Sequence, residues 1–380
     1  MAILFLTGII ITFFLSSLLI TKRGKTQADY ILTAWLFVLG IHLSLFYIVQ
    51  TQQYQDWPYL LGLEIPLPLV HAPLLFLYTA ALTNQFPRKY YWVVHFIPVL
   101  FVYIMLAGFL SRSAADKIWV YQNEGRGYEQ AARWIFSGII LSGLSYIGLS
   151  LYYLKKYRRN ILNVFADTEK INLNWLYYLI IGITVIWTVV IWGDDSLIYS
   201  VVVFFILFIG YFGIKQVGIL NNAMLVVKPI PADNREPVYL AKETVAEQEP
   251  ETVKYQKSRI TQPAIQKTHH ALVELMQKDH LFTDVELTLG ALSERLAVHP
   301  NTLSQVINSV EGKNFYDYIN ALRVEAFMKA VNNPENKKYT LLSLAFECGF
   351  NSKASFNRNF KKHTGVSPTE YLKNTSRPVE

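Results

Sequence analysis

The chain has a single cysteine, Cys348, so an internal disulfide framework is excluded. It is also poor in charge over its first 220 residues, where 25 side chains are Asp, Glu, Lys or Arg, against 38 in the remaining 160. Tryptophan is absent after Trp192. This uneven composition excludes a single soluble globule, and the 52% hydrophobic content excludes a fully disordered chain.

Seven long apolar windows fill the charge-poor part of the chain. A membrane-spanning helix needs about 20 mostly apolar residues, and each window is close to that length. The third is the least regular, because it contains Glu64, Pro66, Pro68 and Pro73. We therefore expect a transmembrane domain of about seven helices over residues 1–214. The windows are Ala2–Ile20, Tyr30–Val49, Leu60–Leu82, Tyr91–Leu110, Trp134–Leu154, Leu173–Trp192 and Ser196–Ile214.

The loops between these windows differ in positive charge. Those after the first, third and fifth windows hold ten Lys and Arg residues, and those after the second, fourth and sixth hold four. Cytoplasmic loops are enriched in Lys and Arg. We therefore expect the N-terminus outside and everything after Ile214 in the cytoplasm.

Composition changes again beyond the last window. Residues 215–265 contain five prolines, few aromatic residues and no persistent helical or strand period. Such a stretch is typical of a flexible linker. Helical periodicity returns over residues 266–374, where we expect a separate domain, and residues 375–380 form a short tail.

One short pattern occurs twice in this last domain. In Leu289–Ser309, apolar residues mark two short helices, and Pro300 is suited to starting the second. Thr340–Lys362 has the same layout, with Gly349 just past the end of its first helix. Two short helices joined by a tight turn form a helix-turn-helix. We expect two such units, separated by a longer helix over Phe315–Val331.

The outer faces of the second helices carry small, amide or basic side chains. Side chains of these types can contact phosphates and base edges of DNA. The predicted DNA contacts are Asn301, Thr302, Ser304, Gln305 and Asn308 in the first unit, and Ser352, Lys353, Ser355, Asn357, Arg358, Lys361 and Lys362 in the second. Arg358 has an alternative interpretation as a brace of the fold. Arg323, in the connecting helix, is interpreted as a structural ion-pair partner.

The second unit carries a multi-residue pattern: Gly349-Phe350-Asn351-Ser352, Phe356, Arg358, Phe360-Lys361, Gly365, Pro368 and Tyr371. This pattern resembles the signature of the DNA-binding domain of the AraC/XylS family of bacterial transcription regulators. The resemblance covers about residues 270–374, and Ser293 and Phe327 depart from the family pattern. It implies binding of double-stranded promoter DNA and, for an activator, of RNA polymerase.

Ionisable side chains in the apolar windows are candidates for a second site, because burying them in a membrane is costly. His42 and His71 fall at similar depths in the second and third windows, so a ligand pocket of His42, Glu64 and His71 is one hypothesis. The alternative is that each makes one interhelical hydrogen bond. No motif predicts a metal site, a cofactor or a catalytic residue.

These observations predict an all-α protein: a seven-helix transmembrane bundle followed by a cytoplasmic two-unit helix-turn-helix domain. We expect a sequence-specific transcription regulator in the inner membrane of a bacterium, with promoter DNA and the lipid bilayer as partners. A homodimer and an unidentified small-molecule or membrane signal fit the same hypothesis. Two alternatives stay open: a small-solute transporter or receptor with a DNA-binding readout, and a passively anchored regulator.

Overall fold

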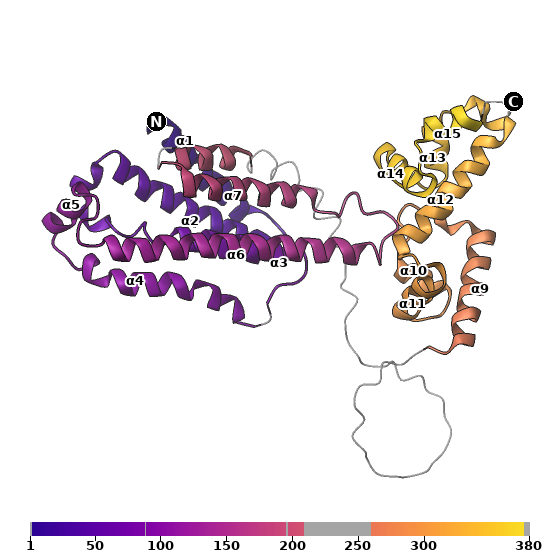
Figure 1. Ribbon diagram of the computed structural model, residues 1–380, viewed down its shortest axis with the longest axis horizontal. Coiled ribbons are helices and arrows are strands. Elements are labelled where there is room, and N and C mark those ends of the chain that lie inside the picture. The colour runs from indigo at the N-terminus through magenta and orange to yellow at the C-terminus, as the bar shows by residue number, and fades with distance from the viewer. Residues whose placement is uncertain (1, 88, 195–196, 209–259, 376–380) are drawn as a thin grey trace, which may run out of the picture. The chain divides into compact units, whose positions relative to one another are not determined.

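The computed structural model describes residues 2–87, 89–194, 197–208 and 260–375, and every regular element within these ranges is helical (Figure 1). The chain divides into two compact units. The first comprises Met1–Tyr157 and Leu173–Val227, and the second comprises Arg158–Asn172 and Lys228–Glu380.

The expected boundary at residue 214 lies outside the described residues. The segment Arg158–Asn172 precedes that boundary in the sequence, yet it belongs to the second unit. Most of the expected linker lies outside the described residues. Its last residues, from Gln262 to Ile265, are helical, and Ile265 is buried.

The first unit contains eight described α-helices and three short 3₁₀ turns. They are α1 (Ala2–Thr21), α2 (Gln27–Gln50), η1 (Gln53–Gln55), η2 (Pro58–Leu60), α3 (Pro68–Leu82), η3 (Tyr91–Phe96), α4 (Ile97–Leu110), α5 (Ala114–Gln122), α6 (Glu129–Ile161, whose last residues belong to the second unit), α7 (Asn174–Trp192) and a helix over Leu197–Phe208.

Five of the described helices are long and apolar enough to cross a membrane: Ile3–Thr21, Gln27–Gln50, Tyr91–Leu110, Glu129–Ile161 and Asn174–Trp192. Two apolar helices, Pro68–Leu82 and Leu197–Phe208, are shorter. The third expected span is α-helical only from Pro68. Pro68 occupies the first turn of α3, where its missing amide donor costs nothing, and Pro73 lies inside the same helix. The seventh is described only as far as Phe208.

Large apolar side chains point outward from these helices. Ile104 in α4, Leu141 in α6 and Phe204 are 64%, 69% and 63% exposed. Soluble domains rarely expose large apolar patches, whereas lipid solvates them. The inward side chains form small cores, one of which joins α1, α2 and the helix Leu197–Phe208 through Leu15, Leu36, Leu43 and Ile206.

The second unit contains nine further described elements. They are α9 (Gln262–Asp279), η4 (Leu281–Thr283), α10 (Leu289–Arg295), α11 (Pro300–Glu311), α12 (Phe315–Asn332), η5 (Pro334–Lys338), α13 (Leu341–Glu347), α14 (Lys353–Thr364) and α15 (Pro368–Thr375).

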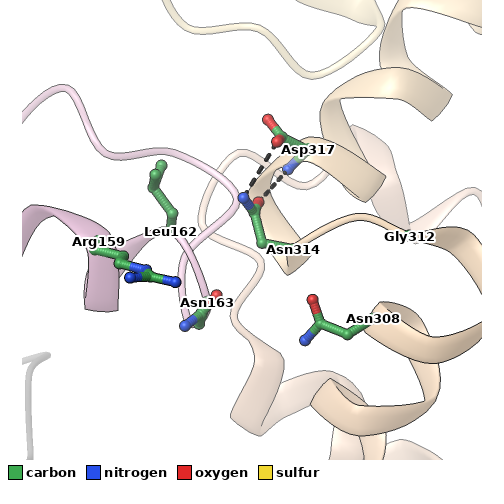
Figure 2. A pocket seen from close by; sticks show the side chains of 7 residues that line it. All are labelled: Arg159, Leu162, Asn163, Asn308, Gly312, Asn314 and Asp317. Atoms are coloured by element: carbon green, nitrogen blue, oxygen red, sulfur yellow. Dashed lines mark hydrogen bonds between the residues drawn. The ribbon is translucent and has the colours of Figure 1, made fainter.

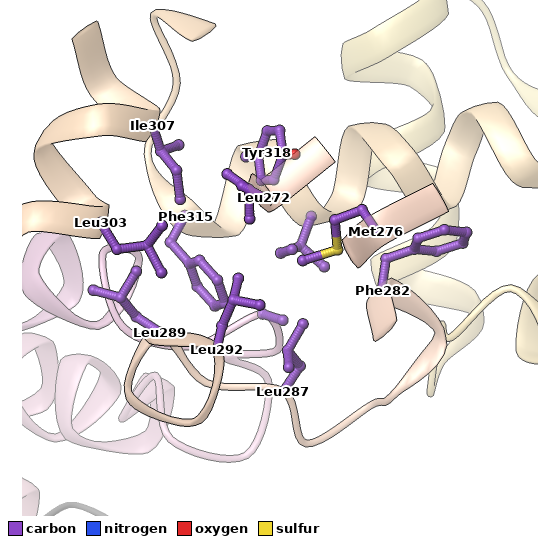
Figure 3. Close-up of a cluster of buried hydrophobic side chains, with 12 residues drawn as sticks. Leu272, Met276, Phe282, Leu287, Leu289, Leu292, Leu303, Ile307, Phe315 and Tyr318 are labelled. Carbon is purple, nitrogen blue, oxygen red and sulfur yellow. The ribbon is translucent and has the colours of Figure 1, made fainter. Parts of the chain in front are cut away.

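Two hydrophobic cores in this unit share α12, one along its first half and the other along its second half. The first joins α9, α10, α11 and the start of α12, and it contains Leu272, Leu292, Leu303, Ile307 and Phe315 (Figure 3). The second contains Val324, Phe327, Phe350, Phe356 and Phe360. Because α12 contributes to both cores, one helix sets the separation of the two helix-turn-helix units, which confirms the connecting helix predicted over Phe315–Val331.

Candidate nucleic-acid interface

The two helix-turn-helix units follow one plan. The first helices, α10 and α13, have 7 residues each, and the second helices, α11 and α14, have 12 each. Thr288 caps α10 by accepting a hydrogen bond from the amide of Ala291, and Thr340 caps α13 in the same way from Ser343, both at 3.1 Å. The two predicted helix-turn-helix units are thus confirmed, and the first helices of both units are capped by threonine in the same way.

The turns between the helices also correspond, but with different residues. Gly349 follows α13 with a φ of 95°, and Ala297 occupies the same place after α10 with a φ of 51°. A Cβ atom on Gly349 would lie 2.7 Å from the carbonyl oxygen of Phe282, so this position admits only glycine. Ser352 and His299 then cap the second helices, which confirms the predicted cap at Ser352.

The outer face of α11 is made of neutral amides. Asn301, Gln305 and Asn308 are exposed, and Thr302 and Ser304 are half-buried. The amide of Asn308 donates to the main-chain oxygen of Ser304 at 2.8 Å. The opposite face is fully buried through Leu303, Val306 and Ile307.

The outer face of α14 is basic. Lys353, Asn357, Lys361 and Lys362 are exposed, and α14 contains no acidic residue. Lys362 also donates from Nζ to the Asp317 carboxylate of α12 at 2.6 Å, although its side chain stays 63% exposed. The two second helices therefore offer different chemistry to a DNA groove.

The predicted outward orientation of Ser355 is wrong. Ser355 is 4% exposed, because it lies one turn before Asn359 on the face of α14 that packs against α12. The Nδ2 atom of Asn359 donates to the Ser355 carbonyl at 2.9 Å and to the Tyr316 hydroxyl at 2.8 Å. Sequence reasoning missed this polar contact, since a serine and an asparagine on a helix are typical of its exposed surface.

Arg358 acts partly as a brace. Its Nη2 atom donates to the Tyr316 hydroxyl at 3.0 Å and lies 3.9 Å from Oε1 of Glu169, while its side chain stays 55% exposed. The guanidinium has five N–H donors, and the hydrogen bond to Tyr316 uses one of them. Arg358 can therefore brace the fold and still donate to DNA.

Arg323 differs from its predicted role. It is 1% exposed and donates to main-chain carbonyls, to Phe282 at 2.6 Å and to Asp284 at 2.7 Å, rather than forming the expected ion pair. Burial lowers the pKa of its guanidinium to about 10. Arg323 thus ties α12 to the chain that precedes α10.

A cavity of about 440 Å³ lies beside the junction of α11 and α12 (Figure 2). Its walls are Arg159, Leu162, Asn163, Asn308, Gly312, Asn314 and Asp317. The side chain of Asn314 caps α12, accepting from the Asp317 amide at 2.8 Å and donating to its carboxylate at 3.1 Å. Asn308 was predicted to contact DNA. In the structure it lines this cavity, opposite Arg159, Leu162 and Asn163 of the segment Arg158–Asn172.

In the first unit, the structure brings together two of the three residues of the hypothetical pocket. Nδ1 of His42 in α2 lies 2.9 Å from Nε2 of His71 in α3, and the Tyr199 hydroxyl lies 3.4 Å from Nε2 of His42. Glu64 is engaged elsewhere, accepting from the Tyr121 hydroxyl and from the Gly62 amide. Within the described ranges, no group of three or more His, Cys, Asp or Glu residues could hold a metal ion.

The two-unit geometry agrees with comparison to a protein family. Residues 292–374 match the family model described as a helix-turn-helix domain. This region is an AraC-type helix-turn-helix domain. Such a domain implies DNA as a partner.

Relatives share about a fifth of this chain. An HTH-type transcriptional regulator of Mycobacterium tuberculosis is 27% identical over 85 residues, which are 22% of this chain and 32% of that protein. PqrA of Proteus vulgaris, named a probable transcription factor, is 28% identical over 76 residues, 20% of this chain and 60% of its own length. This chain thus spans about a third of the first relative and less than two thirds of the second.

A solved structure of a protein of unknown function from Listeria innocua is 27% identical, with 28% of this chain and 94% of that one covered, and its TM-score is 0.24.

Proposed function

We propose that this chain is a membrane-bound, sequence-specific transcription regulator whose helix-turn-helix domain binds promoter DNA in the cytoplasm of a bacterium. One observation carries the proposal: a single chain combines five apolar helices of membrane-spanning length with an AraC-type helix-turn-helix domain. The excess of Lys and Arg in alternate loops supports the cytoplasmic side for that domain.

The chemistry of the two outer faces supports a division of labour on DNA. Asn and Gln side chains pair with adenine through two hydrogen bonds, so Asn301 and Gln305 of α11 suit base recognition. Lysines neutralise phosphates, so Lys353 and Lys361 of α14 suit backbone binding. Asn357 is exposed on the same face of α14. The secondary contacts in this proposal are Thr302, Ser304, Asn308, Ser352, Arg358 and Lys362.

The first unit would then attach the regulator to the lipid bilayer and pass a signal to it. RNA polymerase is a further partner if the regulator is an activator, and two copies could occupy adjacent half-sites as a dimer. Under this proposal, the pairing of His42 with His71 between α2 and α3 is the contact that a signal would change.

A small-solute receptor or transporter is the second candidate for the first unit. It is favoured by Nδ1 of His71, which is buried and has no hydrogen-bond partner among the described residues. Buried polar atoms normally have partners, so a bound solute would satisfy this one. Loss of solute binding in His71→Phe, with DNA binding retained, would support this candidate; regulation that survives His71→Phe unchanged would favour a passive anchor.

The test of the regulator proposal is genome-wide crosslinking and sequencing with the full chain. We expect discrete sites that share one sequence motif, and loss of these sites in Lys353→Ala/Lys361→Ala. The matched control is Lys337→Ala/Lys338→Ala, which removes the same charge from exposed positions of η5. It should retain the sites. Enrichment without discrete sites for the unmodified chain would contradict sequence-specific regulation.

A further inference from the structure

The segment Arg158–Asn172 is built into the first core of the helix-turn-helix domain. Ala166 is 1% exposed within that core. Phe165 forms an isolated antiparallel bridge with Thr288. The main-chain hydrogen bonds between the segment and the domain are Ala166 N to Leu287 O at 3.1 Å, Leu289 N to Val164 O at 2.8 Å and Tyr316 N to Leu162 O at 2.9 Å.

Buried side chains of α12 hold the same segment. Nδ2 of Asn320 donates to the carbonyl oxygen of Ala166 at 3.0 Å, and Nη1 of Arg323 lies 3.4 Å from the same oxygen. Asn320 and Arg323 are 2% and 1% exposed. A buried donor left without an acceptor costs about 1–3 kcal/mol, so docking of the segment is part of the stable arrangement of this unit.

Two carboxylates of the segment lie against the second helix-turn-helix unit. Asp167 accepts a hydrogen bond from Nδ2 of Asn351, the residue before the cap of α14. Oε1 of Glu169 lies 3.9 Å from Nη2 of Arg358. The N-terminus of a helix attracts anions, and DNA phosphates commonly bind there. Asp167 therefore stands where a phosphate would approach the start of α14, and Glu169 stands beside Arg358, one of the predicted DNA contacts.

The two ends of the segment are tied to each other and to the apolar helices. Nε of Arg158 donates to the carbonyl oxygen of Asn172 at 2.9 Å, which closes the base of the segment. The chain enters it directly from α6, which is helical through Ile161, and leaves it into α7, which begins at Asn174. A change in the spacing of α6 and α7 would thus act on both ends of the segment.

We propose that Arg158–Asn172 is an autoinhibitory clamp. Docked, it places Asp167 beside the start of α14 and Glu169 beside Arg358 in the middle of that helix, and both carboxylates repel DNA phosphates. A rearrangement of α6 and α7 withdraws the carboxylates and frees this part of the DNA-binding surface. This proposal rests on the proposed function, since the clamp regulates DNA binding by the same domain. The clamp is the element through which the apolar helices would control that binding.

The first test removes the two charges in the full chain, reconstituted in lipid nanodiscs. The probe is a random-sequence DNA duplex of about 40 base pairs, long enough for two half-sites one helical turn apart. We expect Asp167→Asn/Glu169→Gln to bind about tenfold more tightly. Its slope of log affinity against log salt should be steeper by about 0.9 for each additional phosphate that the variant neutralises.

The matched control for this test is Glu325→Gln/Glu335→Gln. It removes the same charge from exposed positions of the same unit, and its affinity should stay within about twofold of that of the unmodified chain.

The outcomes separate the clamp from the proposed function. Equal binding by the unmodified chain and by Asp167→Asn/Glu169→Gln, or weaker binding by the variant, overturns the clamp and leaves DNA binding intact. Failure of every protein, the control included, to bind the duplex contradicts the proposed function itself.

The second test locks the clamp. Asp167→Cys/Asn351→Cys, in a Cys348→Ala background that removes the native thiol, places two cysteines at positions whose side chains are in contact. Because Asp167→Cys removes one of the two carboxylates, Glu169 alone repels DNA in the locked state. We expect oxidation to form the crosslink in nanodiscs and to weaken duplex binding about threefold relative to the reduced protein, and we expect a reductant to restore binding. Each single cysteine variant is the control. A crosslink that forms without weakening DNA binding, or that does not form, overturns the clamp.

Discussion

The two helix-turn-helix units share lengths and caps but differ in chemistry. The first has an alanine in its turn and neutral amides on α11, whereas the second has a glycine in its turn and lysines on α14. The second is also the unit on which Asp167 and Glu169 lie. Under the proposed function, the two units share one framework and contact DNA in different ways. The proposed clamp then places its carboxylates on the unit whose lysines attract DNA most strongly.

The largest expected difference between the units is in their turns. Gly349→Ala should destabilise the second unit by about 3 kcal/mol, because a side chain at this φ is strained and its Cβ would overlap the Phe282 carbonyl. Cys348 provides the measurement. Burial raises the pKa of this only cysteine to about 11, so alkylation near pH 8 reports opening of the second unit.

Because the Gly349→Ala site adjoins the thiol, urea unfolding followed by circular dichroism is the independent check. An unchanged alkylation rate together with an unchanged unfolding midpoint would show that the second turn does not require glycine.

Base recognition should be lost more from the first unit than from the second. Gln305→Ala removes an exposed amide from α11 and should cost about 1–3 kcal/mol of discrimination at one base position. The measurement is selection from a randomised duplex library, followed by comparison of the enriched motifs. Asn357→Ala on α14 is the matched amide control, and a greater loss of discrimination there would reverse the division of labour between the units.

Phosphate binding should be lost from the second unit. Lys361→Ala should weaken binding to all sequences alike, and the slope of log affinity against log salt should fall by about 0.9 for the one phosphate that is no longer neutralised. Fluorescence anisotropy over a salt series gives both quantities. If the slope stays constant while the preferred sequence changes, Lys361 contacts bases and not the backbone.

The smallest expected effect is a change in stability at the turn of the first unit, opposite in sign to that of Gly349→Ala. Ala297→Gly should stabilise the first unit by about 0.5 kcal/mol, since glycine relieves the positive φ of 51° at this exposed position but adds freedom to the unfolded chain. Urea unfolding checks the sign. Destabilisation by more than about 1 kcal/mol would mean that the two turns are not equivalent.

Local features of the helix-turn-helix domain were predictable from sequence, because each depends on neighbouring residues alone. Gly349 after a helix, Pro300 at a helix start and Ser352 as a cap each have one stereochemical reason that holds in any fold. The inward face of α14 at Ser355 was not predictable. It depends on Asn359, which donates to the Ser355 carbonyl oxygen, and on Tyr316, a residue far away in the sequence whose hydroxyl accepts a hydrogen bond from Asn359.

The segment Arg158–Asn172 was hidden for a similar reason. Its positive flanks are explained by membrane orientation, and the apolar residues Val164, Phe165 and Ala166 are too few to show a period. Their presence, together with Leu162, in a connection between two apolar windows was the available signal. In the first unit, the similar depths of His42 and His71 in their helices suggested that the two side chains could meet. The contact of Glu64 with Tyr121 was not predictable, because Tyr121 lies in α5, a short helix between two apolar windows.

Protease protection is the most direct measurement of whether the helix-turn-helix domain is held on the cytoplasmic side of a membrane. A tag fused after Glu380 should resist protease added to intact spheroplasts and should be digested in inverted membrane vesicles. Digestion in intact spheroplasts would place the domain on the side away from the chromosome, and recovery of the tagged chain without membranes would show that the apolar helices do not anchor it; either result would contradict a membrane-bound regulator of transcription.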